Sequence, residues 1–296
     1  MRLVFATALA LLLASPAFAE SLTYDGRQRD YILRLPDGVE RPPLILVLHG
    51  GGGRGRQIDR GTGLTQQATA QGFALVYPDA IDRQWNDGRG DPNSVEHAST
   101  VDDVGFLSAL VADLATKGLI DPARVFVMGV SNGGMMTYRM VCERAELFVG
   151  AVAIVANLPQ AMAPQCNPSR PMPLMVLNGT KDPLVPYDGG DIVVFGLNRG
   201  TVISTEATLE RFSVANGCTG RQPVQADDPA PGDGVTPEHE VFVGCSADLE
   251  LWRYVGGGHG WPGAGQYRQE SLVGVVAHKP TVNDLALAFF RAQLGE

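Results

Sequence analysis

The sequence lacks the features of proteins that bind nucleic acids or insert into membranes. Its 23 lysine and arginine residues are outnumbered by 32 aspartate and glutamate residues, and the net charge of −9 would repel phosphate backbones and anionic lipids. After residue 19 no apolar run approaches the roughly 20 residues that span a bilayer. No cysteine lies near residue 19 to carry a lipid. We therefore expect no nucleic-acid partner and no membrane anchor.

Cysteine and histidine are also scarce, and the sequence has no internal repeat, low-complexity linker or charge block. There are four cysteines and five histidines, and no two cysteines have the CxxC spacing of common zinc sites. We expect neither a metal site nor a cofactor. The even composition along the chain favours a single domain.

Residues 1–19 have the pattern of a secretory signal peptide. Arg2 precedes an apolar run over residues 3–13, which is followed by a proline and the small-residue triplet Ala-Phe-Ala. We expect cleavage before Glu20, export to the periplasm or the extracellular space, and one catalytic domain over residues 20–296.

The four cysteines are candidates for disulfide bonds, because an exported chain meets an oxidising environment. They are Cys142, Cys166, Cys218 and Cys245. Three pairings are possible, and pairing of nearest neighbours would close two loops of roughly 25 residues, each worth about 3 kcal/mol. The spacing alone leaves all three pairings open.

The hydrophobic pattern predicts an α/β protein. An Asp25-Gly26 turn signal predicts an N-terminal antiparallel hairpin over residues 21–35. Short, mostly continuous apolar runs, typical of strands covered on both faces, occur at 43–50, 73–79, 124–130, 150–156, 173–179 and 249–255. Helical segments are predicted at 64–71, 103–117, 133–144, 205–216 and 281–294. We expect a mostly parallel sheet of about eight strands flanked by helices, with functional residues at the carboxyl ends of the strands.

The stretch VMGVSNGGMMT, residues 127–137, contains a candidate nucleophile. Ser131 lies between a predicted strand and a predicted helix, with Gly129 two residues before it and Gly133 two residues after it. Such a tight turn crowds the backbone, and residues without a Cβ let the serine be presented at the helix N-terminus. The alternative is a glycine-rich loop with an N-capping serine.

A serine hydroxyl needs a base to take its proton, and the base needs a carboxylate to orient it. The histidines are His49, His97, His239, His259 and His278. Only His259 lies in a glycine-rich loop shortly after a predicted strand, and Asp182 follows the strand predicted before it. The chain order Ser131, Asp182, His259 is the one that α/β-hydrolases use. Asp188 and Asp191 are nearby alternatives for the carboxylate.

Acyl transfer also needs N–H donors for the oxyanion that develops on the substrate. The run LHGGGG, residues 48–53, follows the first buried strand, and we take Gly50 and Gly51 as candidate donors. The second donor should be the backbone N–H of Asn132. A phosphate-binding loop is the alternative, but the lysine and serine or threonine of a P-loop are absent.

Together these segments resemble the exported polyhydroxybutyrate depolymerase-like esterases and the related feruloyl esterases of carbohydrate esterase family one. The matching segments, in the family's order, are LVLHGGGG, YPDAIDRQWNDGRG, DDVGFLSALVADL, VFVMGVSNGGMMTYRMVCE, LNGTKDPLVPYDGG and GGGHGWPG. The resemblance implies an α/β-hydrolase fold and the three catalytic residues above. It also favours the neighbour disulfides, Cys142 with Cys166 and Cys218 with Cys245.

The resemblance further implies a pocket for the acyl group. Trp85, in the segment RQWNDGRG, would border this pocket, and packing in the core is the alternative. We also assign Trp261, which follows the histidine, to substrate binding. The family commonly has threonine where this chain has Gly260, so we expect a looser histidine loop and a wider pocket.

The sequence thus predicts a secreted serine esterase that hydrolyses hydroxyalkanoate oligomers or feruloyl and other aryl esters through an acyl-enzyme intermediate. One alternative is a serine peptidase of the prolyl-oligopeptidase type. The other is a catalytically inactive, ligand-binding homologue. The partner is a small or oligomeric ester, and nothing in the sequence predicts the oligomeric state.

Overall fold

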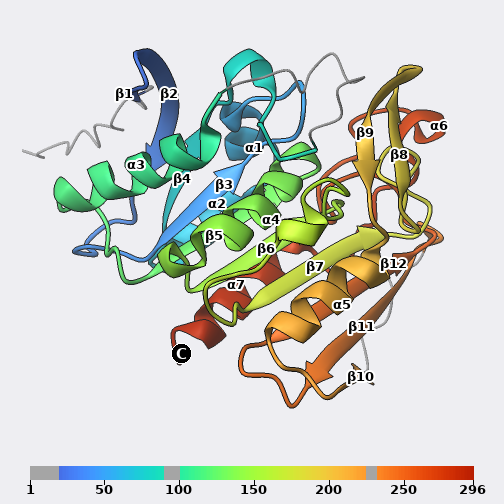
Figure 1. Cartoon of the computed structure of the whole chain (residues 1–296). Coiled ribbons are helices and arrows are strands. Elements are labelled where there is room, and N and C mark those ends of the chain that lie inside the picture. The colour runs from blue at the N-terminus through green and yellow to red at the C-terminus, as the bar shows by residue number, and fades with distance from the viewer. Residues whose placement is uncertain (1–19, 90–100, 225–231) are drawn as a thin grey trace, which may run out of the picture.

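A mostly parallel sheet of ten strands forms the centre of the computed structural model, which describes residues 20–89, 101–224 and 232–296. In order across the sheet the strands are β1 (Glu20–Tyr24), β2 (Arg27–Arg34), β4 (Ala74–Pro78), β3 (Leu44–Leu48), β5 (Val125–Val130), β6 (Gly150–Ile154), β7 (Leu174–Gly179), β12 (Leu249–Val255), β11 (Thr236–Val243) and β10 (Gly220–Val224). The strands from β4 to β12 are parallel, and antiparallel strands flank them at both edges (Figure 1).

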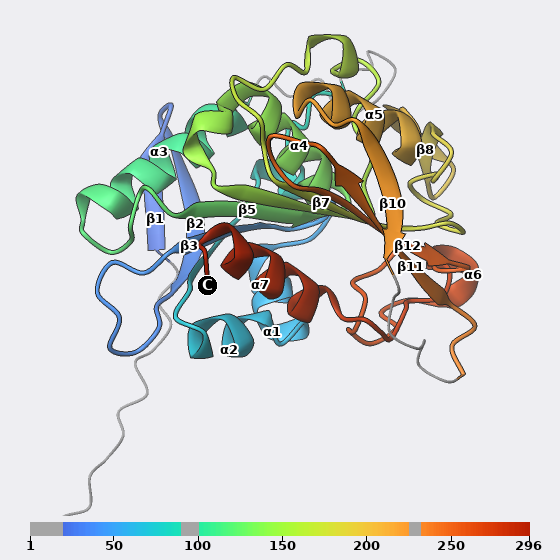
Figure 2. The same cartoon turned by 90° about the horizontal axis from the view of Figure 1, so that it is seen from below.

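Helices cover both faces of this sheet, as Figure 2 shows. One face carries α3 (Asp103–Thr116), α4 (Asn132–Arg144) and α5 (Thr205–Ala215), and the other carries α1 (Gly55–Gly61), α2 (Leu64–Ala70) and α7 (Val282–Gln293). The remaining helical segments are α6 (Glu270–Val273) and the 3₁₀ turns η1 (Ile81–Arg83), η2 (Ala145–Leu147) and η3 (Ala163–Gln165). Because both faces are covered, the central strands are buried along their length, as β3 illustrates. Leu44 and Leu46 pack into one core cluster, and Ile45 and Val47 into the other.

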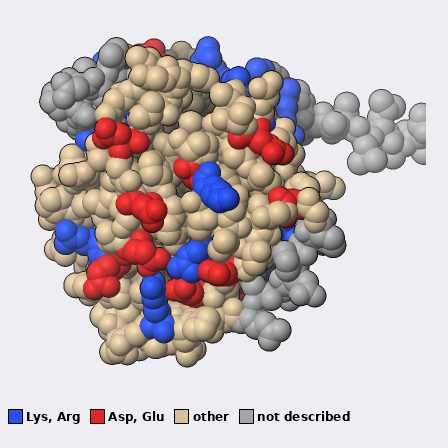
Figure 3. Space-filling view, turned by 90° about the vertical axis from the view of Figure 1, so that its right-hand side faces the viewer, with Lys and Arg blue, Asp and Glu red and all other residues tan. Residues whose placement is uncertain are grey.

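A separate hairpin stands beside the carboxyl ends of the parallel strands. It consists of β8 (Gly190–Val194) and β9 (Leu197–Val202), and it ends in a turn where Phe195 is 78% exposed. In the space-filling view of this side, uncharged residues cover most of the upper part, where the hairpin lies, and most acidic residues lie below it (Figure 3).

The predicted α/β class, the N-terminal hairpin and the parallel central strands are confirmed. The sheet has ten strands rather than about eight, because β10 and β11 extend it beyond β12. β10 is exposed at every position, so no apolar run marks it in the sequence. The predicted signal peptide, residues 1–19, lies outside the described residues, and the assignment of residues 20–296 to one domain stays a prediction.

Two disulfide bonds join nearest neighbours along the chain. Cys142 of α4 is bonded to Cys166, and Cys218 is bonded to Cys245. The first ties the end of α4 to the segment after η3, and the second joins the turn after α5 to the end of β11. The pairing that the family resemblance favoured is therefore confirmed. Within the described ranges, no helix combines the length and the hydrophobicity needed to cross a membrane.

Candidate active site

Ser131 occupies a strained turn between β5 and α4. Its backbone has φ +57° and ψ −122°, a region that residues with a side chain rarely adopt. Hydrogen bonds hold it there, because its N–H donates to the carbonyl oxygen of Ile154 and its own carbonyl accepts from the N–H of Met135, both at 2.9 Å. The turn therefore holds the serine at the junction of strand and helix, at the carboxyl edge of the sheet.

The two glycines around Ser131 are required by backbone crowding. A Cβ on Gly129 would collide with the carbonyl oxygen of Gly133, and a Cβ on Gly133 would collide with the carbonyl oxygen of Leu48 at the end of β3. These obstacles are main-chain atoms, which cannot rotate out of the way as a side chain can. Backbone crowding thus explains why residues without a Cβ, as predicted, occupy both positions.

His259 and Asp182 form a buried hydrogen-bonded pair. The distance between His259 Nδ1 and Asp182 Oδ2 is 2.7 Å, and the two residues are only 5% and 8% exposed. Asp182 Oδ1 accepts the backbone N–H groups of Leu184 and Val185 at 2.8 and 2.9 Å. With the Nδ1 proton directed at a carboxylate, Nε2 keeps its lone pair, which is the state a general base requires.

The strand order brings this pair to the same sheet edge as the serine. Ser131 follows β5, Asp182 follows β7 and His259 follows β12, and the intervening neighbours are all parallel. The histidine loop rests directly on the end of β7, where a Cβ on Gly179 would lie 2.7 Å from the carbonyl oxygen of Gly258.

The alternative carboxylates lie elsewhere: Asp188 is exposed, and Asp191 accepts a hydrogen bond from Thr201 within the β8–β9 hairpin.

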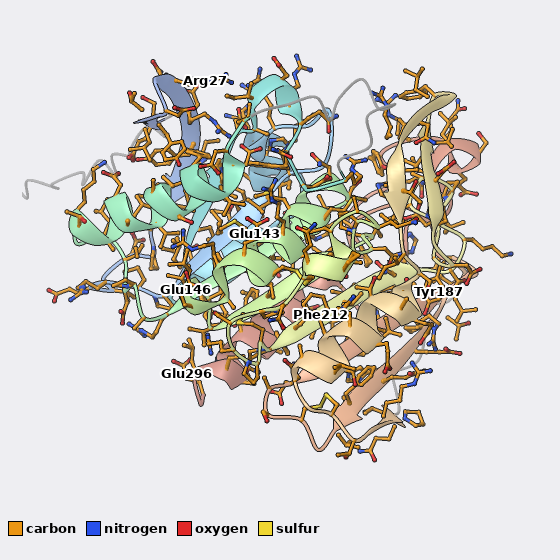
Figure 4. The ribbon with its side chains drawn as sticks, viewed as in Figure 1. Arg27, Glu143, Glu146, Tyr187, Phe212 and Glu296 are labelled. Atoms are coloured by element: carbon orange, nitrogen blue, oxygen red, sulfur yellow. A yellow bond between two sulfur atoms is a disulfide. The ribbon has the colours of Figure 1, made fainter. Side chains whose placement is uncertain are left out.

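The loop that carries Asp182 is tied to two other elements through Tyr187, which is labelled in Figure 4. The Tyr187 hydroxyl accepts from Arg253 Nε of β12 at 2.7 Å and lies 3.1 Å from Glu206 Oε1 of α5, to which it donates. The Tyr187 carbonyl also accepts the N–H of Thr205 at 2.8 Å. These contacts hold the aspartate loop against both the sheet and α5.

Two of the candidate oxyanion donors, Gly50 and Asn132, lie next to Ser131. Gly50 is the nearer of the two loop glycines, since a Cβ built on it would lie 3.5 Å from Ser131 Cβ. Gly51 faces Gln84, whose Oε1 would lie 2.8 Å from a Cβ at that glycine. Asn132 is the first residue of α4, so its N–H is one of the helix-terminal donors that have no acceptor within the helix.

His49 contacts this glycine loop, a role that the sequence did not predict. Its Nε2 accepts the backbone N–H of Ala80 at 3.0 Å, so the ring proton must lie on Nδ1, which donates to the carbonyl oxygen of Gly50 at 2.8 Å. Burial lowers the pKa of the imidazole and outweighs the hydrogen bond to the Gly50 carbonyl oxygen and the nearby Asp79, which both raise it. The only sequence signal for this contact is the His-Gly pair at the end of an apolar run.

The two tryptophans assigned to substrate binding are both buried. Trp85 is 1% exposed and its Nε1 donates to the carbonyl oxygen of His49 at 2.9 Å. Trp261 is 7% exposed and its Nε1 donates to Asn283 Oδ1 at 3.0 Å. Neither indole has much free surface for a ligand, and for Trp85 the position fits the packing alternative rather than the predicted contact with an acyl group.

The expectation of a looser histidine loop is wrong. A Cβ on Gly260 would collide with Cγ2 of Val276, so the space that a threonine would need is already filled. The loop is also held from its other side, where His259 N–H donates to the carbonyl oxygen of Val273 and Gly258 N–H donates to that of Val275. Val276 thus fills the space beside Gly260.

Two of the other histidines, His239 and His278, make different contacts, and the third lies outside the described residues. His239 stacks on Trp252, with ring centroids 4.2 Å apart, and its Nε2 lies 3.0 Å from Glu250 Oε2. His278 has a side chain that is 64% exposed, and His97 lies outside the described residues. Among the residues that the structure describes, no three histidine, cysteine, aspartate or glutamate side chains gather as metal ligands would.

Comparison with known proteins points to esterases. The model of the prolyl oligopeptidase family matches residues 64–160. The chain is 32% identical over 289 residues to the "Putative esterase NocK" of Nocardia uniformis subsp. tsuyamanensis, covering 92% of this chain and 81% of that protein. It is 29% identical over 243 residues to feruloyl esterase C of Emericella nidulans, covering 79% and 77%. The solved acetyl xylan esterase from Aspergillus awamori has the same fold, with a TM-score of 0.58, 15% identity and coverage of 89% and 94%.

Proposed function

Because this chain belongs to the feruloyl esterase-like α/β-hydrolases, we propose that it is a serine esterase that cleaves carboxylic esters through an acyl-enzyme intermediate. The observation that carries the proposal is the 2.7 Å contact between His259 and Asp182 at the sheet edge where Ser131 occupies its strained turn. The proposed nucleophile, carboxylate and base thus follow three strands of one sheet, in the chain order that hydrolases use.

In the first step the Ser131 hydroxyl attacks the ester carbonyl carbon while His259 Nε2 takes its proton. Asp182 stabilises the imidazolium that forms. The negative charge on the former carbonyl oxygen is held by N–H groups of the Gly50 loop and of Asn132, each worth about 3 kcal/mol of transition-state stabilisation. Collapse of the intermediate breaks the bond to the alcohol oxygen, which receives the proton from His259.

In the second step a water molecule takes the place of the alcohol. His259 removes a proton from the water as its oxygen attacks the acyl carbon, and the same donors hold the second oxyanion. The bond to the Ser131 oxygen then breaks, the serine regains its proton from His259, and the acid product leaves. The proposed machinery consists entirely of side chains and backbone groups of this chain.

We propose feruloyl or other aryl esters as the preferred substrates and hydroxyalkanoate oligomers as the second class to test. The 29% sequence identity to feruloyl esterase C of Emericella nidulans supports the first choice. A comparison of kcat/KM for methyl ferulate, 4-nitrophenyl acetate and the hydroxybutyrate dimer and trimer tests it. A preference for the hydroxybutyrate oligomers over methyl ferulate would reverse the order.

We further propose that the protein is secreted. The signal-peptide pattern of residues 1–19 and the two disulfides support this localisation, since disulfides persist in oxidising compartments. Expression of the full chain in a Gram-negative host, followed by fractionation and N-terminal sequencing, should give a periplasmic or extracellular protein that begins at Glu20. An uncleaved chain in the cytoplasm would contradict the proposal.

Labelling tests the nucleophile directly. A serine-directed fluorophosphonate, followed by peptide mass spectrometry, should place the adduct on Ser131, and Ser131→Ala should lose both labelling and esterase activity. Ser108→Ala is a matched control, because that hydroxyl donates within α3 to the carbonyl oxygen of Val104. Wild-type ester hydrolysis by Ser131→Ala would refute the assignment.

A serine peptidase is the second candidate, favoured by the match of residues 64–160 to the prolyl oligopeptidase family. A proline-containing peptide anilide, assayed beside 4-nitrophenyl acetate and methyl ferulate, separates the two candidates. We expect hydrolysis of the esters and no measurable cleavage of the anilide. A higher kcat/KM for the anilide would make the protein a peptidase.

A further inference from the structure

Trp85 joins the two segments that carry the candidate oxyanion donors. Its indole Nε1–H donates to the carbonyl oxygen of His49, the residue before Gly50, at 2.9 Å. Its backbone N–H donates to Asn132 Oδ1 at 2.8 Å, and its carbonyl oxygen accepts from Asn132 Nδ2 at 3.1 Å. One residue thus holds the loop after β3 with its side chain and the first residue of α4 with its backbone.

We propose that Trp85 is a positioning residue that sets the spacing of the two oxyanion donors, an inference that rests on the proposed esterase function. On the first side, the contact acts through peptide planarity. A trans peptide directs its C=O and its N–H in opposite directions. Fixing the carbonyl of His49 therefore fixes the direction of the Gly50 N–H, which belongs to the same peptide.

His49 extends this control to the next peptide. Its Nδ1–H donates to the carbonyl oxygen of Gly50, so the direction of the Gly51 N–H is fixed in the same way. The imidazole also packs against the indole of Trp85, with ring centroids 5.0 Å apart. Whichever glycine donates to the oxyanion, its carbonyl partner is held by Trp85 directly or by the histidine beside it.

On the second side, the contact acts through the side chain of Asn132. Its amide orientation is unambiguous, because Oδ1 faces a backbone N–H while Nδ2 faces the carbonyl oxygen of Trp85 and, at 2.7 Å, Asp87 Oδ2. Asp87 is fully buried and is paired in turn with Arg89 Nε at 2.9 Å. The side chain of Asn132 is therefore occupied by the protein, and its backbone N–H remains for the substrate.

Because Trp85 is buried, it can position the oxyanion donors but offers almost no surface for binding a substrate. With 1% of the residue exposed, the indole has almost no surface for an acyl group, whereas both donor segments lie within its hydrogen-bonding reach. A residue that only fills the core affects the free energy of unfolding. A residue that spaces oxyanion donors affects stabilisation of the transition state, and so kcat rather than KM.

Trp85→Phe tests the inference because it removes the indole N–H while it keeps an aromatic ring and all the backbone contacts. We expect kcat for 4-nitrophenyl acetate to fall about tenfold with KM unchanged, since misplacement of catalytic groups by a fraction of an ångström already lowers the rate. The Ki of an aryl trifluoromethyl ketone, whose serine adduct places an oxyanion between the same donors, should rise about tenfold as well.

Trp252→Phe is the matched control. Trp252 is also buried, but its Nε1 has no hydrogen-bond partner among the described residues, so removing that N–H should change neither kcat nor Ki. If Trp85→Phe does not fold, Trp85 can be replaced through an amber codon by 3-benzothienylalanine, which keeps the bicyclic shape without the N–H. The expected changes are the same.

The outcomes separate the inference from the proposed function. Unchanged kcat and Ki in a folded Trp85 variant, or a raised KM at constant kcat, would overturn the positioning role while an inactive Ser131→Ala leaves the esterase mechanism standing. Wild-type activity of Ser131→Ala would remove the esterase mechanism itself. A tenfold loss in kcat and in inhibitor affinity, absent from Trp252→Phe, supports the inference.

Discussion

Asp182 bonds His259 through one carboxylate oxygen only. Oδ2 lies 2.7 Å from His259 Nδ1, while Oδ1 accepts the backbone N–H groups of Leu184 and Val185. The backbone hydrogen bonds fix the rotation of the carboxylate group, and the carboxylate in turn fixes the orientation of the His259 imidazole ring. The orientation of the proposed base is therefore determined by the turn that follows β7.

Because the two oxygens of the Asp182 carboxylate have different hydrogen-bond partners, the effect of Asp182→Asn can be predicted. The amide oxygen can keep the two backbone bonds, but the amide nitrogen then faces Nδ1 as a second donor and stabilises the wrong tautomer. We expect kcat for 4-nitrophenyl acetate to fall by about 10⁴ with little change in the urea midpoint. Asp188→Asn, on an exposed residue of the same loop, is the control and should keep full activity. A loss of less than tenfold in Asp182→Asn would argue against the assigned role.

The lowered pKa of His49 predicts a pH dependence of stability. The folded state resists protonation of this ring because of burial, whereas the unfolded chain takes up the proton near the ordinary histidine pKa of about 6.5. Below that pH the unfolded state binds more protons, so His49 lowers the free energy of unfolding as the pH falls, by at most about 1.4 kcal/mol per pH unit. Above it the effect vanishes.

His49→Gln isolates this contribution. The glutamine has no titrating group, and its Oε1 offers an acceptor for the Ala80 N–H that His49 Nε2 now accepts. Urea unfolding between pH 7.5 and 5.0 should show a shallower loss of stability in the variant than in the wild type. Equal slopes would mean that the folded state protonates His49 as easily as the unfolded chain does.

Backbone crowding at the serine turn predicts that Gly133→Ala is severely destabilising. The added Cβ meets the carbonyl oxygen of Leu48, a main-chain atom of β3, so relief requires the strand and α4 to move apart. We expect a loss of about 3 kcal/mol in the free energy of unfolding, or no folded protein. Gly61→Ala is the matched control, because a Cβ on that residue of α1 meets nothing within 4 Å, and it should raise stability by up to about 1 kcal/mol. Equal effects of the two substitutions would contradict the packing argument.

The contact between Gly260 and Val276 predicts a pairwise coupling. Gly260→Thr should displace the histidine loop and lower kcat/KM by at least about tenfold, and Val276→Ala should restore part of it in the double variant by vacating the space. Val276→Ala alone should lose stability but keep its activity. Additive effects in a double-mutant cycle would show that the two positions do not compete for the same volume.

Most of the fold could be predicted from local patterns. The apolar runs of β3, β5, β6 and β7 are continuous because both sheet faces are covered, and the helix starting at Asp103 has its N-cap at Asp102, which accepts from the N–H of Gly105. β10 escaped prediction because no position along it is buried. Local periodicity reflects burial, so an exposed strand leaves little trace in the sequence.

The candidate site could be predicted only in part. The relation of Ser131, Asp182 and His259 to strand ends follows from chain order, whereas the role of Trp85 depends on contacts with His49 and Asn132, 36 and 47 residues away in the sequence. A tryptophan in a polar loop suggests a ligand contact, and only the tertiary structure shows that its N–H is already used. The proximity of Val276 to Gly260 could not be predicted for the same reason, because nothing in the sequence connects the two positions.

The backbone contacts around the serine turn also limit where this protein can change. At Gly129, Gly133 and Gly179 the nearest atoms that a Cβ would meet belong to the main chain. We therefore expect no gain from substitutions at these positions, whether they arise by mutational drift or in a directed-evolution library. The β8–β9 hairpin, with Phe195 exposed at its tip, carries no such restriction on its outer surface. Sequence variation is therefore easier to accommodate in that hairpin than in the turn that contains Ser131.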